Sequence, residues 1–256
     1  MRGHQQRMGQ TTPSTLRGQG ALETASLPVD SPPRKRRSSM KLYNANLSNF
    51  ASKCRLAIYE KNAKVDIVPI PGGDLKSPEY LKIYPMGKTP ALELDGEIIG
   101  ESEVINELLE ESFPSPPLLP KEPKARARVR GISRFHDLYL EPPLRALFPQ
   151  ASAKEKDQKL IAEKLAELNL RLDQLELMLS RGPYAIGSAF TFADCALAPT
   201  FFFANLMLPM LGSKPFTEGR PKLAAWWGQV QKRPTVEKVH AEQQQALMER
   251  MQQPAH

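Results

Sequence analysis

Residues 85–102 read PMGKTPALELDGEIIGES, and this stretch decides the class of fold. Its two short apolar runs, 90–94 and 97–99, are joined by Asp95-Gly96, which is among the strongest short signals for a β-hairpin. Ser102 then precedes a segment in which apolar residues recur at helical spacing, so it is expected to cap a helix. The stretch therefore predicts a hairpin that leads directly into a helix.

The residues before the hairpin alternate between strand and helix patterns. Strand patterns occupy 41–43 and 65–70, and helix patterns occupy 50–60 and 77–84. Residues 40–113 therefore have the order β-α-β-α-β-β-α. We expect the first three strands to form a crossover unit and the last strand to pair antiparallel through the hairpin.

A proline-rich linker separates this part of the chain from a helical part. Residues 113–123 contain five prolines, which are incompatible with a helix or a central strand, so 114–123 is predicted to be a semi-rigid linker. Residues 124–252 follow helical periodicity throughout. The expected helices cover 125–139, ending where Pro142-Pro143 interrupts the pattern, then 161–179, 191–210, a segment starting at Pro221, and one from Pro234 to about Met251. The fold class is thus an α/β domain followed by an all-α domain.

The net charge of +7 is concentrated at the N-terminus. Residues 1–39 hold seven of the 35 basic residues and two of the 28 acidic ones, which leaves the remainder of the chain nearly neutral. This extension lacks apolar periodicity and is predicted to be disordered. Three interpretations remain for it: a solvated tail, a targeting segment, or the product of a start assigned upstream of Met40. The nearly neutral body gives no reason to expect a nucleic-acid partner.

Cysteine usage and hydropathy restrict the location of the protein. Two cysteines in 256 residues cannot form a disulfide framework, so we expect a reducing, cytoplasmic environment. We expect no membrane span, because Pro199, Asn205 and Pro209 interrupt the most apolar stretch, 196–211. The four histidines and two cysteines show no metal-ligand spacing, so no metal is expected.

Three short motifs are expected to lie at one edge of the predicted sheet. Ser48 precedes the first helix, Lys88-Thr89-Pro90 leads into the third strand, and Glu101-Ser102 begins the third helix. Each motif alone is ordinary, since serines commonly cap helices and proline commonly opens an edge strand. Their joint spacing within this order of elements indicates a binding site.

Residues 40 to about 240 resemble a cytosolic glutathione S-transferase. The motifs that carry the resemblance are Leu42-Tyr43, Leu47-Ser48-Asn49, Cys54-Arg55-Leu56-Ala57-Ile58, Lys76-Ser77-Pro78-Glu79-Tyr80-Leu81, Pro85 to Leu92, Glu101-Ser102, Ala185-Ile186-Gly187, Phe190 to Asp194 and Gly219 to Trp226. The resemblance implies an N-terminal thioredoxin-like domain joined to an all-helical domain. It also implies a detoxifying transferase that uses glutathione as co-substrate against a small hydrophobic electrophile and acts as a homodimer.

The resemblance also assigns roles to the glutathione-binding residues. Pro90 is expected to be cis, so that the backbone of Thr89 pairs with the cysteinyl residue as an added strand does. Ser102, at a helix N-terminus, suits the γ-glutamyl carboxylate, and Glu101 suits the ammonium group beside it. Lys88, with Lys76 as a further candidate, is assigned to the glycyl carboxylate.

Ser48 is the predicted catalytic residue, whose hydroxyl would donate a hydrogen bond to the glutathione thiolate. A free thiol has a pKa of about 8.5, so only ~3% is ionised at neutral pH. Lowering that pKa by about two units requires roughly 2.7 kcal/mol. A charge-assisted hydrogen bond of ~1.5–3 kcal/mol and a helix N-terminus worth ~0.3–1 kcal/mol supply it. Tyr43 is the alternative catalytic residue, and Cys54 would indicate a thiol-exchange enzyme.

The choice of serine points toward theta- and zeta-like transferases. Zeta-like enzymes include isomerases with a Ser-Ser-Cys signature, which is replaced by Ser48-Asn49-Phe50 here. This departure argues against the isomerases. Three alternatives to the transferase remain: a glutathione-dependent isomerase, a dehalogenase, and a non-catalytic binding protein of the same fold. The expected walls of the electrophile site are Phe50, Phe135, His136, Tyr139 and Leu144.

Overall fold

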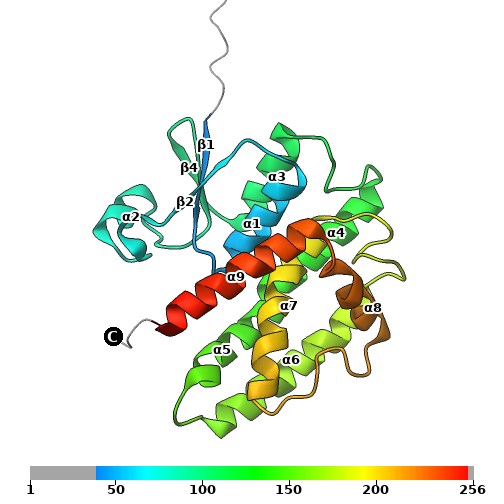
Figure 1. Cartoon of the computed structure of the whole chain (residues 1–256). Coiled ribbons are helices and arrows are strands. Elements are labelled where there is room, and N and C mark those ends of the chain that lie inside the picture. The colour runs from blue at the N-terminus through cyan, green and yellow to red at the C-terminus, as the bar shows by residue number, and fades with distance from the viewer. Residues whose placement is uncertain (1–38, 253–256) are drawn as a thin grey trace, which may run out of the picture. The chain divides into compact units, whose positions relative to one another are not determined.

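The hairpin predicted at Asp95-Gly96 forms the edge of a β-sheet in the computed structural model, which describes residues 39–252 (Figure 1). Asp95 and Gly96 both have positive φ, 51° and 92°, as the tight two-residue turn of a hairpin requires. Apart from Ser39, the predicted extension 1–39 lies outside the described residues. The elements of this half are β1 (Met40–Asn44), α1 (Asn49–Glu60), β2 (Asp66–Pro69), the short turn η1 (Pro71–Gly73), α2 (Pro78–Ile83), β3 (Ala91–Leu94), β4 (Glu97–Ile99) and α3 (Ser102–Ser112).

The sheet is mixed, with the strand order β2-β1-β3-β4 among residues 39–252. β1 and β2 run parallel, with Leu42 opposite Ile67, whereas β3 runs antiparallel to β1 and to β4. The order β-α-β-α-β-β-α is confirmed, but the prediction that the first three strands form one crossover unit is wrong for β3. Of the six residues of α2 only Tyr80 is buried, so this helix offers little apolar surface for a crossover packed on the sheet.

The second half of the described chain is helical, as predicted. α3 ends at Ser112 and α4 begins at Pro123, on either side of the proline-rich segment. Residues 39–252 belong to one compact unit, and the domain division at 114–123 stays a prediction. The helical elements are α4 (Pro123–Phe135), η2 (His136–Leu140), α5 (Glu141–Ser152), α6 (Gln158–Met178), α7 (Phe192–Met210), α8 (Pro221–Val230) and α9 (Pro234–Gln252).

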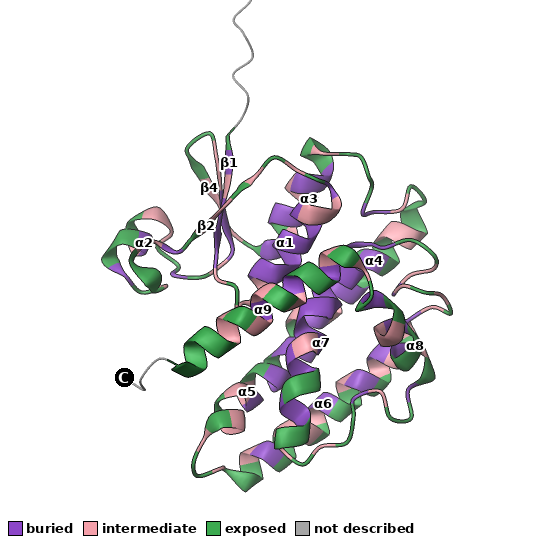
Figure 2. Cartoon of the chain, viewed as in Figure 1, coloured by how far each residue is buried: buried purple, intermediate pink, exposed green. Residues whose placement is uncertain are grey.

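α7 is the central helix of this half and is buried along most of its length (Figure 2). It continues through Pro199 and Pro209, so the expectation that prolines interrupt the apolar stretch is wrong. Within residues 39–252 it is the one helix long and apolar enough to cross a membrane. Because 78% of its most apolar window is buried by the surrounding chain, α7 is the core helix of the helical half.

Pro142 and Pro143 do not end the helical path, contrary to the sequence-based expectation. α4 passes into η2, a single π-helical turn closed by the N–H of Glu141, which donates to the carbonyl of His136 five residues earlier. The two prolines lie in the first turn of α5, where their missing N–H groups are not needed. α5, which the sequence analysis did not predict, therefore follows directly.

α1 is buried on almost every side and connects the two halves (Figure 2). It packs against α3 and α7, and one apolar core extends from Leu42 in the sheet through Leu56 of α1 to Leu197 of α7. The helix also carries two buried cations, Lys53 and Arg55. Buried charges require partners, and both of these lie within two turns of Ser48.

Candidate active site

Ser48 caps the N-terminus of α1 with a hydroxyl that remains partly exposed. Its Oγ accepts a hydrogen bond from the N–H of Ala51 at 3.2 Å and donates to the carbonyl of Thr89 across 3.5 Å. Ser48 lines an open hollow of about 580 Å³ together with Ala45, Leu47, Phe50, Leu75, Gly87, Lys88, Thr89 and Arg145. The contact with Thr89 is at the limit of hydrogen-bond length, so the hydroxyl proton is readily redirected to a ligand.

The segment Lys88-Thr89-Pro90 is held firmly at the edge of this hollow. The Thr89–Pro90 peptide bond is cis, as expected. The hydroxyl of Thr89 donates to the carbonyl of Tyr43 at 3.0 Å, and the hydroxyl of Tyr80 donates to the carbonyl of Lys88 at 2.6 Å. These bonds fix the backbone of Thr89 beside Ser48.

A second hollow of about 220 Å³ adjoins the first and shares Phe50, Lys88 and Thr89 with it. All five predicted glutathione-binding residues line this second hollow. Its full lining is Phe50, Tyr84, Lys88, Thr89, Pro90, Glu101, Ser102, Arg134, Asp137 and Leu138. The structure thus brings the predicted binding residues together, and it places Ser48 in the hollow next to them.

Glu101 adopts a backbone conformation that non-glycine residues rarely take, with φ of 65° and ψ of 115°. It is exposed and directly precedes Ser102, the first, buried residue of α3, so the expectation that Ser102 caps this helix is wrong: Glu101 occupies the N-cap position, without a side-chain hydrogen bond. Backbone strain of this kind persists only where the surroundings hold it, and it is concentrated at ligand sites. The strained residue turns the chain so that α3 begins at the wall of the hollow.

Tyr43 and Cys54, the rivals of Ser48, line neither hollow. Tyr43 is buried, and its hydroxyl donates to Glu93 at 2.6 Å. Burial and this hydrogen bond raise the pKa of Tyr43 above its usual value. Cys54 is fully buried, with its Sγ 3.5 Å from the carbonyl of Ser102, and burial raises the pKa of its thiol. Both side chains are therefore packed in their neutral forms.

The expected walls of the electrophile site are only partly correct. Phe50 lines both hollows, but His136 and Leu144 are buried in the core. Phe135 and Tyr139 line a separate surface groove. The wall beside Ser48 is formed instead by Arg145, whose guanidinium lies 5.6 Å from the centre of the Phe50 ring. Nothing in residues 39–252 groups three or more metal-ligating side chains.

Two family descriptions match the chain. The glutathione S-transferase N-terminal domain matches residues 42–117, and the glutathione S-transferase C-terminal domain matches residues 135–234. The chain is also 34% identical over 168 residues to probable maleylacetoacetate isomerase 2 of Drosophila melanogaster, across 64% of this chain and 74% of that protein. The chain belongs to the glutathione S-transferase family.

Further relatives of the family agree with this assignment. A glutathione S-transferase of Pseudomonas putida is 27% identical over 209 residues, which cover 81% of this chain and 94% of that protein. The crystal structure of glutathione transferase F7 from Populus trichocarpa has 26% identity and a TM-score of 0.69, over 80% of this chain and 99% of that one. The predicted family and the predicted two-part fold are confirmed.

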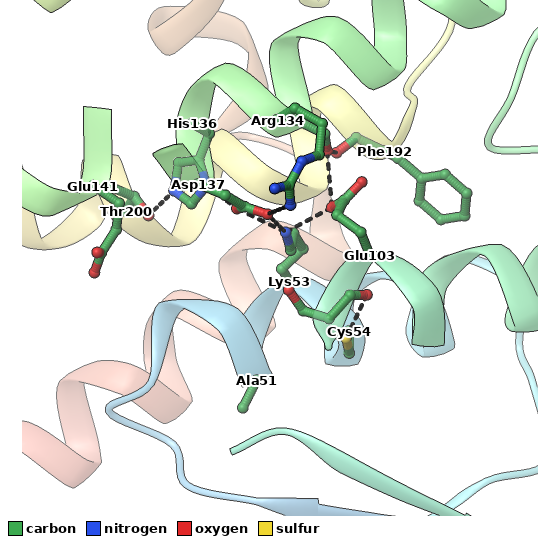
Figure 3. A network of polar contacts seen from close by, with 12 residues as sticks. Ala51, Lys53, Cys54, Glu103, Arg134, His136, Asp137, Glu141, Phe192 and Thr200 are labelled. Carbon is green, nitrogen blue, oxygen red and sulfur yellow. Dashed lines mark hydrogen bonds and ion pairs between the residues drawn. The ribbon is translucent and has the colours of Figure 1, made fainter. Parts of the chain in front are cut away.

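Behind the hollows of this glutathione S-transferase family member lies a buried charge network that the sequence analysis missed (Figure 3). Lys53 is fully buried, and its Nζ lies 2.6 Å from Glu103 Oε1 and 3.0 Å from Asp137 Oδ1. Burial alone would lower the pKa of Lys53, but the two carboxylates outweigh it and raise that pKa. His136 joins the network through Nδ1, 2.8 Å from Asp137, and Nε2, 2.6 Å from Thr200.

Asp137 connects this network to the second hollow. Its carboxylate pairs with the buried Lys53, and the same residue lines the hollow. Burial would raise its pKa, but the hydrogen bond from His136 and the charge of Lys53 lower it below the usual value. Asp137 is therefore a fixed negative charge at the wall of the second hollow.

A second missed residue, Arg55, holds the turn that precedes Ser48. Its guanidinium donates to the side chain and carbonyl of Asn46, and its Nη2 donates to Ser52 at 2.7 Å. Nη1 also lies 2.9 Å from Glu242 of α9. Arg55 thus ties the turn that carries Ser48 to the last helix. The signal in the sequence that identifies such residues is a charged side chain within a helix whose other residues are mostly apolar, and it applies to both Lys53 and Arg55.

Proposed function

We propose that this protein is a glutathione S-transferase in which the Ser48 hydroxyl holds the thiol of glutathione as a thiolate for attack on a small electrophile. One observation carries the proposal. Ser48 and the five predicted binding residues line two adjoining hollows at one edge of the sheet. Glutathione suits such a site, because it is an extended tripeptide with a carboxylate at each end and a thiol between them.

The position of Thr89 supports the role of Ser48. The backbone of Thr89 would pair with the cysteinyl residue of glutathione, as an added β-strand pairs with an edge. The Ser48 hydroxyl is directed at the carbonyl of this same residue across 3.5 Å. A cysteinyl sulfur held beside Thr89 therefore comes within reach of that hydroxyl, whose proton then turns from the carbonyl to the sulfur.

The two ends of glutathione match the charges of the second hollow. The backbone N–H of Ser102 at the start of α3 would donate to the γ-glutamyl carboxylate, since helix N-termini attract anions. Glu101 would bind the neighbouring ammonium group. Lys88 lines both hollows and would face the glycyl carboxylate.

The electrophile is proposed to enter the hollow between Phe50 and Arg145. A small hydrophobic compound would pack on the Phe50 ring, and its conjugation to glutathione would serve detoxification in the cytoplasm. Both cysteines are free and buried, which agrees with a reducing compartment.

A second candidate function is glutathione-dependent isomerisation of an anionic substrate. One observation favours it: Arg145 lines the same hollow as Ser48, with its Nε 3.0 Å from the buried carboxylate of Glu141. A guanidinium oriented in this way suits a substrate carboxylate. Relatives named maleylacetoacetate isomerase agree with this candidate. The two candidates differ in the product, a glutathione conjugate or free isomer.

The test is conjugation of an aryl halide by wild type and by Ser48→Ala, after retention on immobilised glutathione is established. Loss of a hydrogen bond to a charged sulfur is worth ~1.5–3 kcal/mol, so Ser48→Ala is expected to lower kcat/KM about tenfold or more. Ser48→Thr keeps the hydroxyl and retains activity. Asp157→Ala removes an equivalent cap, at the start of α6, and leaves turnover unchanged.

The outcomes separate the claims. If wild type is neither retained nor active, the transferase proposal fails. If Ser48→Ala retains full activity, only the assignment of Ser48 fails. Isomerisation of a cis-unsaturated keto acid without net consumption of glutathione would select the second candidate.

We also propose that the protein forms a homodimer through the face shared by α4, η2 and α6. An apolar groove of about 490 Å³ crosses this face, lined by Phe135, Tyr139, Arg171, Gln174, Leu177 and Met178. Leu177 is 81% exposed and lies together with Phe135, Tyr139 and Met178 in this groove, and contiguous apolar patches of this kind mark interaction surfaces. Sedimentation should give a dimer that Leu177→Glu dissociates and that Met210→Glu, a control at another exposed site, does not. A monomeric wild type would contradict this.

A further inference from the structure

The second hollow, which is the proposed glutathione site and is called the glutathione hollow below, receives charged side chains from both halves of the molecule. Lys88 and Glu101 come from the sheet half, and Arg134 and Asp137 come from the end of α4 and from η2. Lys88 and Glu101 belong to the short motifs that carry the family resemblance, whereas Arg134 and Asp137 belong to none of these motifs. Arg134 therefore requires its own explanation.

Arg134 is positioned by a buried relay of charges. Its Nη1 donates to Asp137 Oδ2 at 3.3 Å, and Asp137 is only 10% exposed. The Asp137 carboxylate is itself held in place, because Lys53 donates to both of its oxygens, at 3.0 and 3.1 Å. Figure 3 shows the Arg134 guanidinium beside this cluster. The relay orients the guanidinium at the wall of the hollow.

The guanidinium of Arg134 is available to a ligand. Its side chain is 51% exposed, and its contact with Asp137 uses one nitrogen, Nη1. A guanidinium presents five N–H donors in a planar fork, which matches the two oxygens of a carboxylate. An anion in the hollow would therefore meet Arg134 on one side and the N-terminus of α3, at Ser102, on the other.

We propose that Arg134 binds the α-carboxylate of the γ-glutamyl residue of glutathione, with Asp137 and Lys53 as positioning residues. This inference rests on the proposed function, because it assumes that glutathione occupies the hollow. The γ-glutamyl end carries a carboxylate and an ammonium group on one carbon atom. The paired charges of the hollow, cationic at Arg134 and anionic at Glu101, match that arrangement. Bound glutathione then contacts both halves of the molecule.

The test compares glutathione with 4-aminobutyryl-cysteinylglycine, which is the same tripeptide without the γ-glutamyl α-carboxylate. Calorimetric titration of wild type is expected to show a preference for glutathione of tenfold or more. Arg134→Ala should weaken glutathione binding about tenfold and leave the analogue unchanged, so that the preference falls about tenfold to the part that Ser102 contributes. Arg134→Lys should restore part of it. Arg128→Ala, an exposed arginine on the same helix outside the hollow, should behave as wild type.

Each outcome bears on the proposal. Equal weakening of both ligands by Arg134→Ala would show a structural effect and overturn the assignment, as would an unchanged preference. A wild type that binds glutathione but does not distinguish the analogue would overturn it too. If wild type binds neither ligand, the proposed function itself fails and this inference fails with it. Thermal melting of each variant checks that the fold is retained.

Discussion

The N-termini of α1 and α7 begin alike and differ in what surrounds them. At α7, Thr191 and Asp194 form a reciprocal capping box, and Asp194 is fully buried. Its carboxylate accepts four hydrogen bonds of 2.8–3.0 Å, from the N–H of Ala185, the N–H and the hydroxyl of Thr191, and the indole of Trp226. The Asp194 carboxylate is therefore fully hydrogen-bonded by the protein around it.

At α1 the cap is incomplete and open. Ser48 accepts one hydrogen bond, at 3.2 Å, and gives its own proton to a carbonyl across 3.5 Å. Its hydroxyl faces a hollow, whereas the Asp194 carboxylate faces the core. Two caps of the same kind therefore serve different purposes. The closed cap stabilises the fold, and the open cap is left free to bind a ligand.

The largest expected effect is at the closed cap. Asp194→Ala leaves buried donors without acceptors, each worth ~1–3 kcal/mol, so unfolding in urea should show a loss of about 3–5 kcal/mol. Asp157→Ala removes an exposed cap of α6 and should cost about 1 kcal/mol. Equal losses in the two variants would show that the Asp194 network has no special role in folding.

The next effect concerns the buried charge behind the open cap. Lys53→Met leaves Glu103 and Asp137 without their cation and should destabilise the protein by roughly 3 kcal/mol at neutral pH. In wild type the pKa of Asp137 is lowered, so its contribution is present at neutral pH and lost as the pH falls through that folded-state pKa. In the variant Asp137 lacks the charge of Lys53, so its pKa is higher than in wild type and less stability should be lost on acidification. Urea unfolding at several pH values decides this, and parallel pH profiles would contradict the relay.

A smaller effect is expected at Arg55, which holds the turn before Ser48. Arg55→Lys keeps the charge but loses the fork that contacts Asn46 and Ser52, so kcat should fall several-fold and stability by about 1–2 kcal/mol. Glu242→Gln weakens the contacts of Arg55 and Tyr59 with α9 and should lower stability with kcat retained. If both variants lower kcat equally, the effect of Arg55 on turnover does not arise from its contacts with the turn before Ser48.

The smallest effect is expected at the outer wall of the open hollow. Arg145→Ala removes the partly exposed partner of the buried Glu141 carboxylate, and the effect compared here is the one on turnover. Turnover of a neutral aryl halide should change less than about twofold, while turnover of an electrophile that carries a carboxylate should fall about tenfold. Equal sensitivity of the two substrates would remove the argument for an anionic substrate.

Local signals in the sequence predicted most of the fold. The Asp95-Gly96 turn depends on contacts within a few residues, and it is confirmed. The path through Pro142-Pro143 was misread, because a π-helical turn leaves no periodicity of its own. The direction of β3 was also misread, since strand pairing depends on contacts between distant residues.

The site was predictable only where it coincided with short motifs. Ser48, Thr89 and Ser102 lie at element boundaries, which the sequence marks with caps and a proline. Arg134 and Arg145 lie on helix faces of the second half, and their approach to the hollows depends on how the halves pack. One sequence, taken by itself, contains no local signal that these two arginines reach the hollows.

The central claim is that the open cap at Ser48 lowers the pKa of bound glutathione. Ultraviolet absorbance of the thiolate, followed against pH with glutathione saturating the protein, measures that pKa directly. Wild type should show a value about two units below the free value of about 8.5, and Ser48→Ala should raise it by about one unit or more while glutathione remains bound. An identical pKa in wild type and Ser48→Ala would contradict the account.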